Sequence, residues 1–426
     1  MTEHTQRLWH PFADMARVPQ QELVLVRGKG VWLEDERGRR YLDATASLWY
    51  CNVGYGRTEL ADAAAAQMRE LPAYSTFGPY ANRPALDLAE RLAEIAPVPD
   101  AAVFFTTGGS DAVDTAGKLA RRYWQLRGEP HRTVLVARSE AYHGMNAYGT
   151  SLAGILPNKE GWGPLVTDVI HVPHDDPEAL EQVLAEHGDR IAAFIGEPVI
   201  GAGGVIPPAD GYWERVQRAC AVRDVLLIAD EVITGYGRTG PWFASERYDI
   251  RPDLVTSAKG LTSGYLPLGA VLCGPRVRDA LWSETAGAFR HGYTYSGHAA
   301  ACAVGLANLD IIEREGLRDR VRALEPVLAR ALGGLESDPL VEETRSAGLL
   351  GAVELSAEAR EACPGLADRL VAELQADGVL VRALVGHSLQ ISPPFVIDEG
   401  EIDLLAERIA GALQRVGAEI GAGASA

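Results

Sequence analysis

Five short apolar runs, each followed by polar or glycine-rich residues, constrain the fold of this chain most strongly. They alternate with segments of helical spacing, which is typical of an α/β sheet that is largely parallel. The runs are 102–105, 133–137, 191–195, 225–229 and 254–256. In open sheets of this kind, ligands bind beyond the carboxyl ends of the strands. We therefore expect the residues that follow these runs to share one site.

The flanking segments predict a second, smaller domain. Residues 22–46 hold two apolar runs around Gly28-Lys29-Gly30, which predicts a hairpin. Helical spacing recurs in 59–71, 85–96 and 298–333, and 340–415 mix short strands with helices. We expect an N-terminal segment over 1–58 that is part of the small domain, a large cofactor-binding domain over 59–310, and the C-terminal small domain over 311–426.

Composition excludes several classes of partner. The formal net charge of −18 argues against nucleic acids and anionic membrane surfaces, because both bind basic patches. No apolar stretch reaches the length of about 18 residues that a membrane span needs. The five cysteines form no CxxC pair, and the first residues show no secretory signal, so we expect a reduced, cytoplasmic protein. The histidines show no metal-ligand spacing such as HExxH, and we predict no metal site.

Lys259 stands out among only four lysines, because it ends an apolar run in Ser257-Ala258-Lys259-Gly260. Partial desolvation there lowers the pKa of the amine and frees it as a nucleophile. Without further evidence, a lysine in such a position is more often an ordinary surface residue. Asp230, however, directly follows the preceding apolar run, where an unpaired carboxylate is costly. A salt bridge or a helix cap would also explain an isolated aspartate, so the argument depends on the two residues together.

Three other run ends carry polar or aromatic residues. Thr106-Thr107-Gly108-Gly109-Ser110-Asp111 opens a helix, where glycines and the helix N-terminus suit a phosphate, although Ser110 could simply cap the helix. No GxGxxG or P-loop motif is present. Tyr142-His143 follow the second run, and the tyrosine could stack on a flat ring. Glu197 follows the third run, where it could organise polar groups around a ligand or cap the next turn.

At this point the residues resemble a known family. The stretch Leu227-Ile228-Ala229-Asp230-Glu231-Val232-Ile233-Thr234-Gly235-Tyr236-Gly237-Arg238-Thr239-Gly240, followed by Ala258-Lys259-Gly260, is similar to the signature of the class III aminotransferases. The resemblance extends over nearly the whole chain. It implies pyridoxal 5'-phosphate as cofactor and the fold type I of pyridoxal-phosphate transferases, with a mostly parallel seven-stranded sheet in the large domain and a smaller α+β C-terminal domain.

The resemblance also implies roles for individual residues. Lys259 matches the lysine that carries the cofactor, Asp230 the partner of the ring nitrogen, and Val232 and Tyr142 the residues on its two faces. Gly109 and Ser110 match the phosphate-binding turn, and His143 and Glu197 belong to the same cofactor site. Thr294 matches a threonine that reaches the phosphate from the partner subunit. A homodimer, or a dimer of such dimers, is therefore implied.

Other segments resemble the amine:pyruvate branch of omega-transaminases. In Leu48-Trp49-Tyr50-Cys51-Asn52 the tryptophan matches a wall of the substrate pocket, and Phe12 and Phe77 match further pocket residues, Phe77 across the dimer. Arg382 matches a mobile arginine. Members that act on ornithine or 4-aminobutyrate carry an arginine two residues before the small-Pro-Pro motif, and here that position holds Gln390. Gly78 stands where some members have a second bulky aromatic residue, which leaves the size of the pocket open.

The implied reaction is a ping-pong transfer of an amino group from a primary amine or ω-amino acid to pyruvate or a similar keto acid or aldehyde. Three alternatives stay open at this stage. One is the adenosylmethionine-8-amino-7-oxononanoate (diaminopelargonate) transaminase, although that branch usually has a Trp-Trp pair where this chain has Trp49-Tyr50. Another is a decarboxylase or aminomutase on the same fold. The third is a binding protein without activity, against which the presence of both Lys259 and Asp230 argues.

Overall fold

The computed structural model describes residues 7–424, and its centre is a sheet of seven strands. The strands are β4 (Ala102–Thr106), β5 (Val134–Arg138), β6 (Val169–Val172), β7 (Ile191–Gly196), β8 (Leu226–Asp230), β9 (Leu254–Ser257) and β10 (Gly269–Cys273). Their order is β4-β10-β9-β8-β7-β5-β6. Only β10 runs antiparallel to its neighbours, so the sheet is mostly parallel, as predicted.

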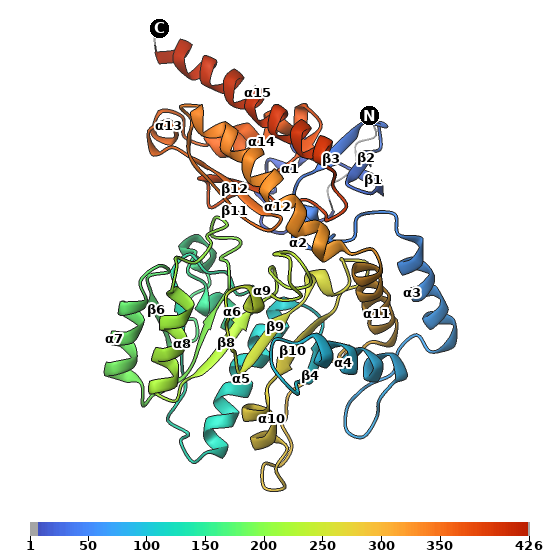
Figure 1. Ribbon diagram of the computed structural model, residues 1–426, viewed down its shortest axis with the longest axis vertical. Coiled ribbons are helices and arrows are strands. Elements are labelled where there is room, and N and C mark those ends of the chain that lie inside the picture. The colour runs from blue at the N-terminus through green and yellow to red at the C-terminus, as the bar shows by residue number, and fades with distance from the viewer. Residues whose placement is uncertain (1–6, 425–426) are drawn as a thin grey trace.

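Helices cover both faces of this sheet, which is why its central strands are buried throughout (Figure 1). On one face α5 (Gly109–Leu126) packs its apolar side against β7 to β10. The same face holds α6 (Ala147–Leu152) and α10 (Pro275–Leu281), and the other holds α7 (Pro177–His187) and α8 (Tyr212–Val222). A strand that is covered on both faces has apolar residues at successive positions. This explains the continuous apolar runs in the sequence.

A second body, built from both ends of the chain, lies above the large sheet in Figure 1. One of its four-stranded sheets has the order β1-β2-β3-β13 and the other β11-β12-β15-β14. The strands are β1 (Leu25–Lys29), β2 (Trp32–Asp35), β3 (Arg40–Asp43), β11 (Val341–Ala347), β12 (Leu350–Leu355), β13 (Val379–Leu380), β14 (Arg382–Leu384) and β15 (Ser388–Ile391). The N-terminal hairpin formed by β1 and β2 was predicted. The next strand, β3, pairs with β2 on one edge and in parallel with β13 on the other. The domain division at residues 58 and 310 stays a prediction.

The remaining helices flank these sheets or connect them. The predicted helices near 59–71, 85–96 and 298–333 are α3 (Thr58–Glu70), α4 (Arg83–Ile95) and the pair α11 (Ala299–Arg314) and α12 (Leu317–Gly333). Further elements are α1 (Val18–Gln21), α2 (Ala46–Trp49), α9 (Ala244–Arg247), α13 (Ala357–Ala362), α14 (Leu366–Ala376), α15 (Glu399–Ala424), η1 (Leu156–Lys159), η2 (Lys259–Leu261) and η3 (Gly334–Ser337). Within residues 7–424 no helix is long and apolar enough to span a membrane.

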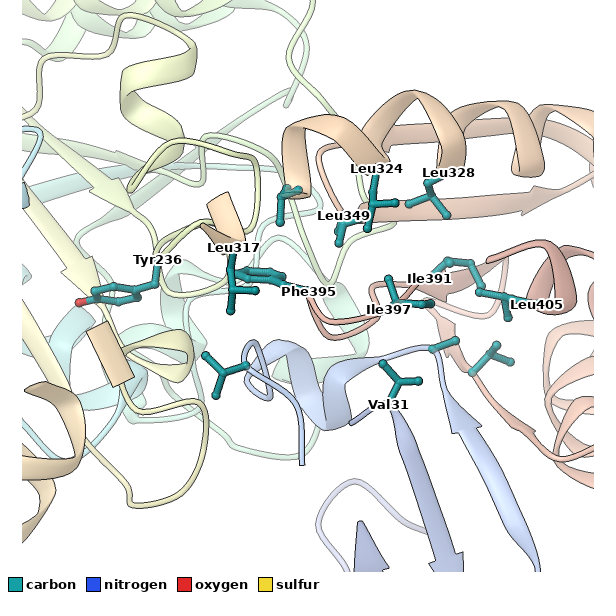
Figure 2. Packing of buried hydrophobic residues seen from close by; sticks show 14 of the residues in the cluster. Val31, Tyr236, Leu317, Leu324, Leu328, Leu349, Ile391, Phe395, Ile397 and Leu405 are labelled. Carbon is teal, nitrogen blue, oxygen red and sulfur yellow. The ribbon is translucent and has the colours of Figure 1, made fainter. Parts of the chain in front are cut away.

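One hydrophobic core joins the two bodies. Figure 2 shows Tyr236, Leu317, Phe395 and Val31, which come from four distant parts of the chain, within the same cluster. Burial of each large apolar side chain contributes about 1.5–3 kcal/mol to stability. The two bodies are therefore packed against each other rather than loosely linked.

A buried arginine adds polar contacts to this junction. Arg238 is fully buried, and its guanidinium donates to the carbonyl oxygens of Leu349 (3.1 Å) and Pro393 (2.6 Å) and to Oδ1 of Asn52 (2.7 Å). It also lies over the ring of Phe395, 4.6 Å from the centroid. These contacts connect the segment after β8 to the N-terminal segment, to the turn between β11 and β12, and to the segment after β15.

Candidate active site

A cavity of about 410 Å³ lies where the polar segments after the parallel strands converge. It brings together the segments that follow β5, β7, β8 and β9, together with the first turn of α5. The predicted cofactor-site residues that line it are Gly109, Ser110, Tyr142, His143, Glu197, Asp230, Val232 and Lys259. The expectation that the strand ends share one site therefore holds for these residues.

Lys259 lies directly after β9, at the first position of η2, with a left-handed backbone (φ +44°). Removal from water lowers the pKa of its amine, Asp230 and Glu197 raise it, and nearby Arg382 lowers it; the net result is a pKa of about 8. Among the residues of the described chain, none forms a hydrogen bond to this amine. A large share of the amine is thus neutral near pH 8 and available as a nucleophile or base.

Asp230 ends β8 with a carboxylate that is almost completely buried. Its Oδ1 accepts hydrogen bonds from the backbone amide of Val232 (3.1 Å) and the hydroxyl of Thr256 (3.0 Å). Its Oδ2 lies 2.7 Å from Nδ1 of His143. These contacts fix the orientation of the carboxylate toward the cavity. Nε2 of His143 is buried and has no partner within residues 7–424.

Glu197, which follows β7, is buried and binds two backbone amides. Oε1 accepts from Tyr142 (3.0 Å) and Oε2 from Gly201 (2.9 Å), and burial raises the pKa of this carboxyl. Glu197 therefore caps the turn after its strand and also holds the backbone of Tyr142 at the cavity wall, while its role around a ligand stays a prediction.

The first turn of α5 offers a site for an anion. Gly108, Gly109 and Ser110 line the cavity at the N-terminus of an 18-residue helix, whose free amides favour negative charge. A Cβ atom on Gly109 would lie 2.7 Å from Cγ1 of Val232, so only glycine fits there. Oγ of Ser110 accepts a hydrogen bond from the amide of Met145 (3.1 Å), which leaves its own proton for an anion.

Trp49 and Arg382 lie beside the lysine, although neither lines the cavity. The indole of Trp49 is 3% exposed, and its ring centroid is 5.8 Å from Nζ of Lys259 and 5.6 Å from Cζ of Arg382. Arg382 begins β14, and burial lowers its pKa. Within the described residues it has no carboxylate partner. A partly buried, unpaired guanidinium is a ready binding group for a carboxylate.

Besides Trp49 and Arg382, three further predicted residues do not line this cavity. Phe12 is 66% exposed and borders a surface groove beside α14. Phe77 is 52% exposed and borders a separate cavity of about 760 Å³ beside Phe104 and Phe289. Thr294 is exposed, outside the cavity of its own chain. For Phe77 and Thr294 this placement is what a role in a partner subunit's site requires, and all three roles stay predictions.

Several cavity residues were not singled out from the sequence. Tyr50 follows Trp49 and Ile233 follows Val232, so adjacency to a matched residue was the available signal for both. Thr262, Gly264 and Leu268 also line the cavity, in the segment between η2 and β10. No motif marked that segment, because β10 itself was not predicted.

The cavity suits a flat ring that carries a phosphate. It has a lysine amine and an imidazole nitrogen of His143 that find no hydrogen-bond partner among residues 7–424, a fixed carboxylate at Asp230, and a glycine turn at a helix N-terminus. Tyr142 and Val232 supply an aromatic and an aliphatic surface. Within residues 7–424 there is no cluster of side chains that could hold a metal ion.

Comparisons with known proteins agree with this arrangement. Residues 15–413 match the family model described as Aminotransferase class-III. The chain is 40% identical to the putrescine–pyruvate aminotransferase of Pseudomonas aeruginosa over 420 residues, which cover 93% of this chain and 91% of the relative. A transaminase structure from the marine bacterium Virgibacillus matches with a TM-score of 0.93 and 37% identity, covering 97% of this chain and 98% of the other. An omega transaminase of Pseudomonas jessenii in complex with PMP matches with a TM-score of 0.92, 37% identity and 97% coverage of both chains.

Proposed function

This chain belongs to the class-III aminotransferases, which use pyridoxal phosphate, and we propose that it moves an amino group from a primary amine or ω-amino acid to pyruvate or a similar keto acid. The observation that carries this proposal is a lysine amine with a pKa of about 8 beside an arginine without a carboxylate partner within the described residues. The lysine serves the amino-group chemistry, and the arginine suits the carboxylate of the acceptor.

We propose that the residues lining the cavity hold pyridoxal phosphate. Gly109 and Ser110 would bind the phosphate, Asp230 the ring nitrogen, and Tyr142 and Val232 the two ring faces. When bound, the cofactor supplies an electron sink for negative charge on the substrate carbon. Asp230, held by its three hydrogen bonds, keeps the ring nitrogen protonated. Lys259 binds the cofactor covalently in the resting enzyme.

Lys259 is also the group that moves the proton. With a substrate amine bound in the site, the neutral amine of Lys259 would take the proton from the substrate carbon and hold it for return. Burial favours this, since a pKa of about 8 keeps a useful share of the amine unprotonated near neutral pH. Arg382 then donates to the carboxylate of the keto acid. The two substrates use the same space in turn, which gives ping-pong kinetics.

We further propose that the enzyme is a cytoplasmic homodimer or a dimer of such dimers. Phe77, Tyr74, Tyr80 and Leu86 are all more than 45% exposed and surround or adjoin the second cavity. Exposed apolar side chains gathered in this way are typical of a protein interface. Thr294 and Phe77 would then reach the partner subunit's site.

The half-reaction tests the proposed activity. Holoenzyme mixed with 1-phenylethylamine and no acceptor should lose the absorption of its lysine-bound cofactor and release one acetophenone per site. Added pyruvate should restore the absorption and yield one alanine per site. Lys259→Ala is the matched control and should do neither. Release of carbon dioxide from an amino acid, or turnover without any acceptor, would assign the chain to a decarboxylase or a mutase instead.

A further inference from the structure

We infer that Asp43 is a positioning residue that sets the size limit for the substrate amine, by holding the loop that carries Trp49. The inference rests on the proposed function, because it concerns the amine that binds beside Lys259. Asp43 is the last residue of β3, and its side chain is 1% exposed. Its register partner is Leu380 of β13, the strand that leads into Arg382.

The carboxylate of Asp43 accepts four hydrogen bonds. Oδ1 accepts from the backbone amide (2.8 Å) and the hydroxyl (2.7 Å) of Thr45. Oδ2 accepts from the backbone amide of Ser47 (2.8 Å) and the hydroxyl of Tyr55 (2.6 Å). Three of these donors belong to the loop 44–50, so one buried side chain fixes its first half. Hydrogen bonds to an ionised acceptor are about twice as strong as neutral ones.

The loop needs such a clamp, because its backbone is strained. Ala46, Ser47 and Trp49 have left-handed φ angles of +46°, +58° and +62°, a region that L-residues with a Cβ rarely adopt. Each residue of this kind raises the free energy of the loop, and such strain persists only where surrounding contacts impose it. Within the loop itself the hydroxyl of Ser47 donates to that of Tyr50 (2.6 Å), but this contact does not fix the loop to the fold.

The strained conformation delivers two aromatic side chains to the site. Trp49 is placed with its ring near both Lys259 and Arg382, and Tyr50 lines the cavity. A buried indole in a fixed position excludes other groups from the volume that it fills. The space left for the substituents of an amine therefore depends on how firmly the loop is held, and thus on Asp43.

Asp43→Asn separates this role from simple packing, because it keeps the shape and removes one acceptor oxygen. The amide nitrogen of asparagine donates, so it cannot bind the Ser47 amide and the Tyr55 hydroxyl as Oδ2 does. The loop should relax and Trp49 should move. A larger amine can then enter the site, and activity on it increases. General damage to the fold would lower activity on every amine instead.

The test compares two amines with pyruvate as acceptor, 2-aminobutane and the bulkier 1-phenylpropylamine. In Asp43→Asn holoenzyme, the kcat/KM ratio of the bulky to the small amine should rise about tenfold, the effect of losing one hydrogen bond to a charged acceptor. Tyr55→Phe removes a donor to the same oxygen from outside the loop and should leave the ratio unchanged. Ala46→Gly, added to Asp43→Asn, should move the ratio back toward the wild-type value, because glycine tolerates φ +46°.

A second readout does not depend on activity. Chymotrypsin cleaves after aromatic residues, and it should cut apo Asp43→Asn after Trp49 or Tyr50 faster than the apo wild type, with the sites mapped by mass spectrometry. The inference would be overturned if Asp43→Asn lost kcat/KM equally for both amines. It would also be overturned if Tyr55→Phe raised the ratio of kcat/KM values as much as Asp43→Asn does. If Asp43→Asn does not fold, Thr45→Val removes only the hydroxyl donor and should raise the ratio about threefold; an unchanged ratio there also overturns it. Failure of the wild type to use either amine refutes the proposed function instead.

Discussion

Nδ1 of His143 lies 2.7 Å from Oδ2 of Asp230, at a point where neither side chain has appreciable contact with solvent. The carboxylate can only accept, so the histidine donates and its tautomer is fixed by Asp230. The unpartnered Nε2 is then the acceptor nitrogen when the ring is neutral. Both carboxylate oxygens of Asp230 are therefore already hydrogen-bonded within the protein where the side chain lines the cavity.

We expect His143→Leu to slow proton transfer by about tenfold, because the buried Oδ2 of Asp230 loses its donor. His143→Asn, which can still donate from a similar position, should lose less. Single-turnover rates with 1-phenylethylamine measure the effect, and thermal unfolding monitors the fold. Equal rates in the two variants would mean that the hydrogen bond to Asp230 does not matter for the reaction.

Asp230→Asn should keep the cofactor bound but slow the amine half-reaction severely. The phosphate contacts at Gly109 and Ser110 are intact in this variant, whereas a ring nitrogen without a carboxylate partner makes a poor electron sink. Equilibrium dialysis of the cofactor and stopped-flow single turnovers distinguish the two effects. A near-wild-type rate would show that Asp230 has only a structural role.

The rate at which apoprotein takes up pyridoxal phosphate should rise with pH up to about 8 and then level off. The reacting form is the neutral Lys259 amine, whose pKa burial lowers to about 8, so the neutral fraction grows roughly tenfold per unit below that value. Arg382 lowers this pKa, and Arg382→Met should therefore move the midpoint upward. Asp230 raises it, and Asp230→Asn should move the midpoint downward. Borohydride reduction with peptide mapping checks that the label lies on Lys259.

Arg382→Ala should weaken the pyruvate half-reaction by roughly 2–5 kcal/mol in transition-state binding, the range for losing one partner of a desolvated charge pair. The half-reaction with 1-phenylethylamine should change much less, because that amine brings no carboxylate. Stopped-flow measurement of each half-reaction gives the two losses separately. Equal losses in both, or none in either, remove Arg382 from the substrate site.

Most of the large sheet could be predicted from the sequence, because strands covered on both faces are continuous apolar runs. Two strands were missed for physical reasons. β6 (Val169–Val172) is an edge strand, partly exposed and interrupted by His171. β10 (Gly269–Cys273) begins with small residues and follows β9 without a crossover helix, so it runs antiparallel and breaks the expected alternation.

Most of the cofactor residues could be predicted because they follow strands, whereas the substrate wall was harder to predict. Nothing in the spacing of residues shows that Phe12 lies on the surface of its own chain or that Trp49 meets both Lys259 and Arg382. Those relationships arise from contacts between segments far apart in the chain. The role proposed for Asp43 could not be predicted from the sequence for the same reason. The four hydrogen bonds to its carboxylate come from residues nearby in the chain, but their effect on the substrate site depends on where Trp49 lies.

The pairing of β3 with β13 also bears on how the enzyme is made. Asp43 pairs with Leu380, so β3, which leads to Trp49 and pairs on its other edge with β2, lacks its second neighbour β13 until nearly nine-tenths of the chain has been synthesised. Contacts this distant in sequence form late and slowly. The strands of the large sheet and the local pairs β1-β2 and β2-β3 can form on the ribosome, whereas the pairing of β3 with β13 waits for the C-terminal part of the chain. A nascent chain arrested before residue 380 would therefore contain its predicted cofactor residues but lack the strand pairing that positions Trp49 beside the substrate amine.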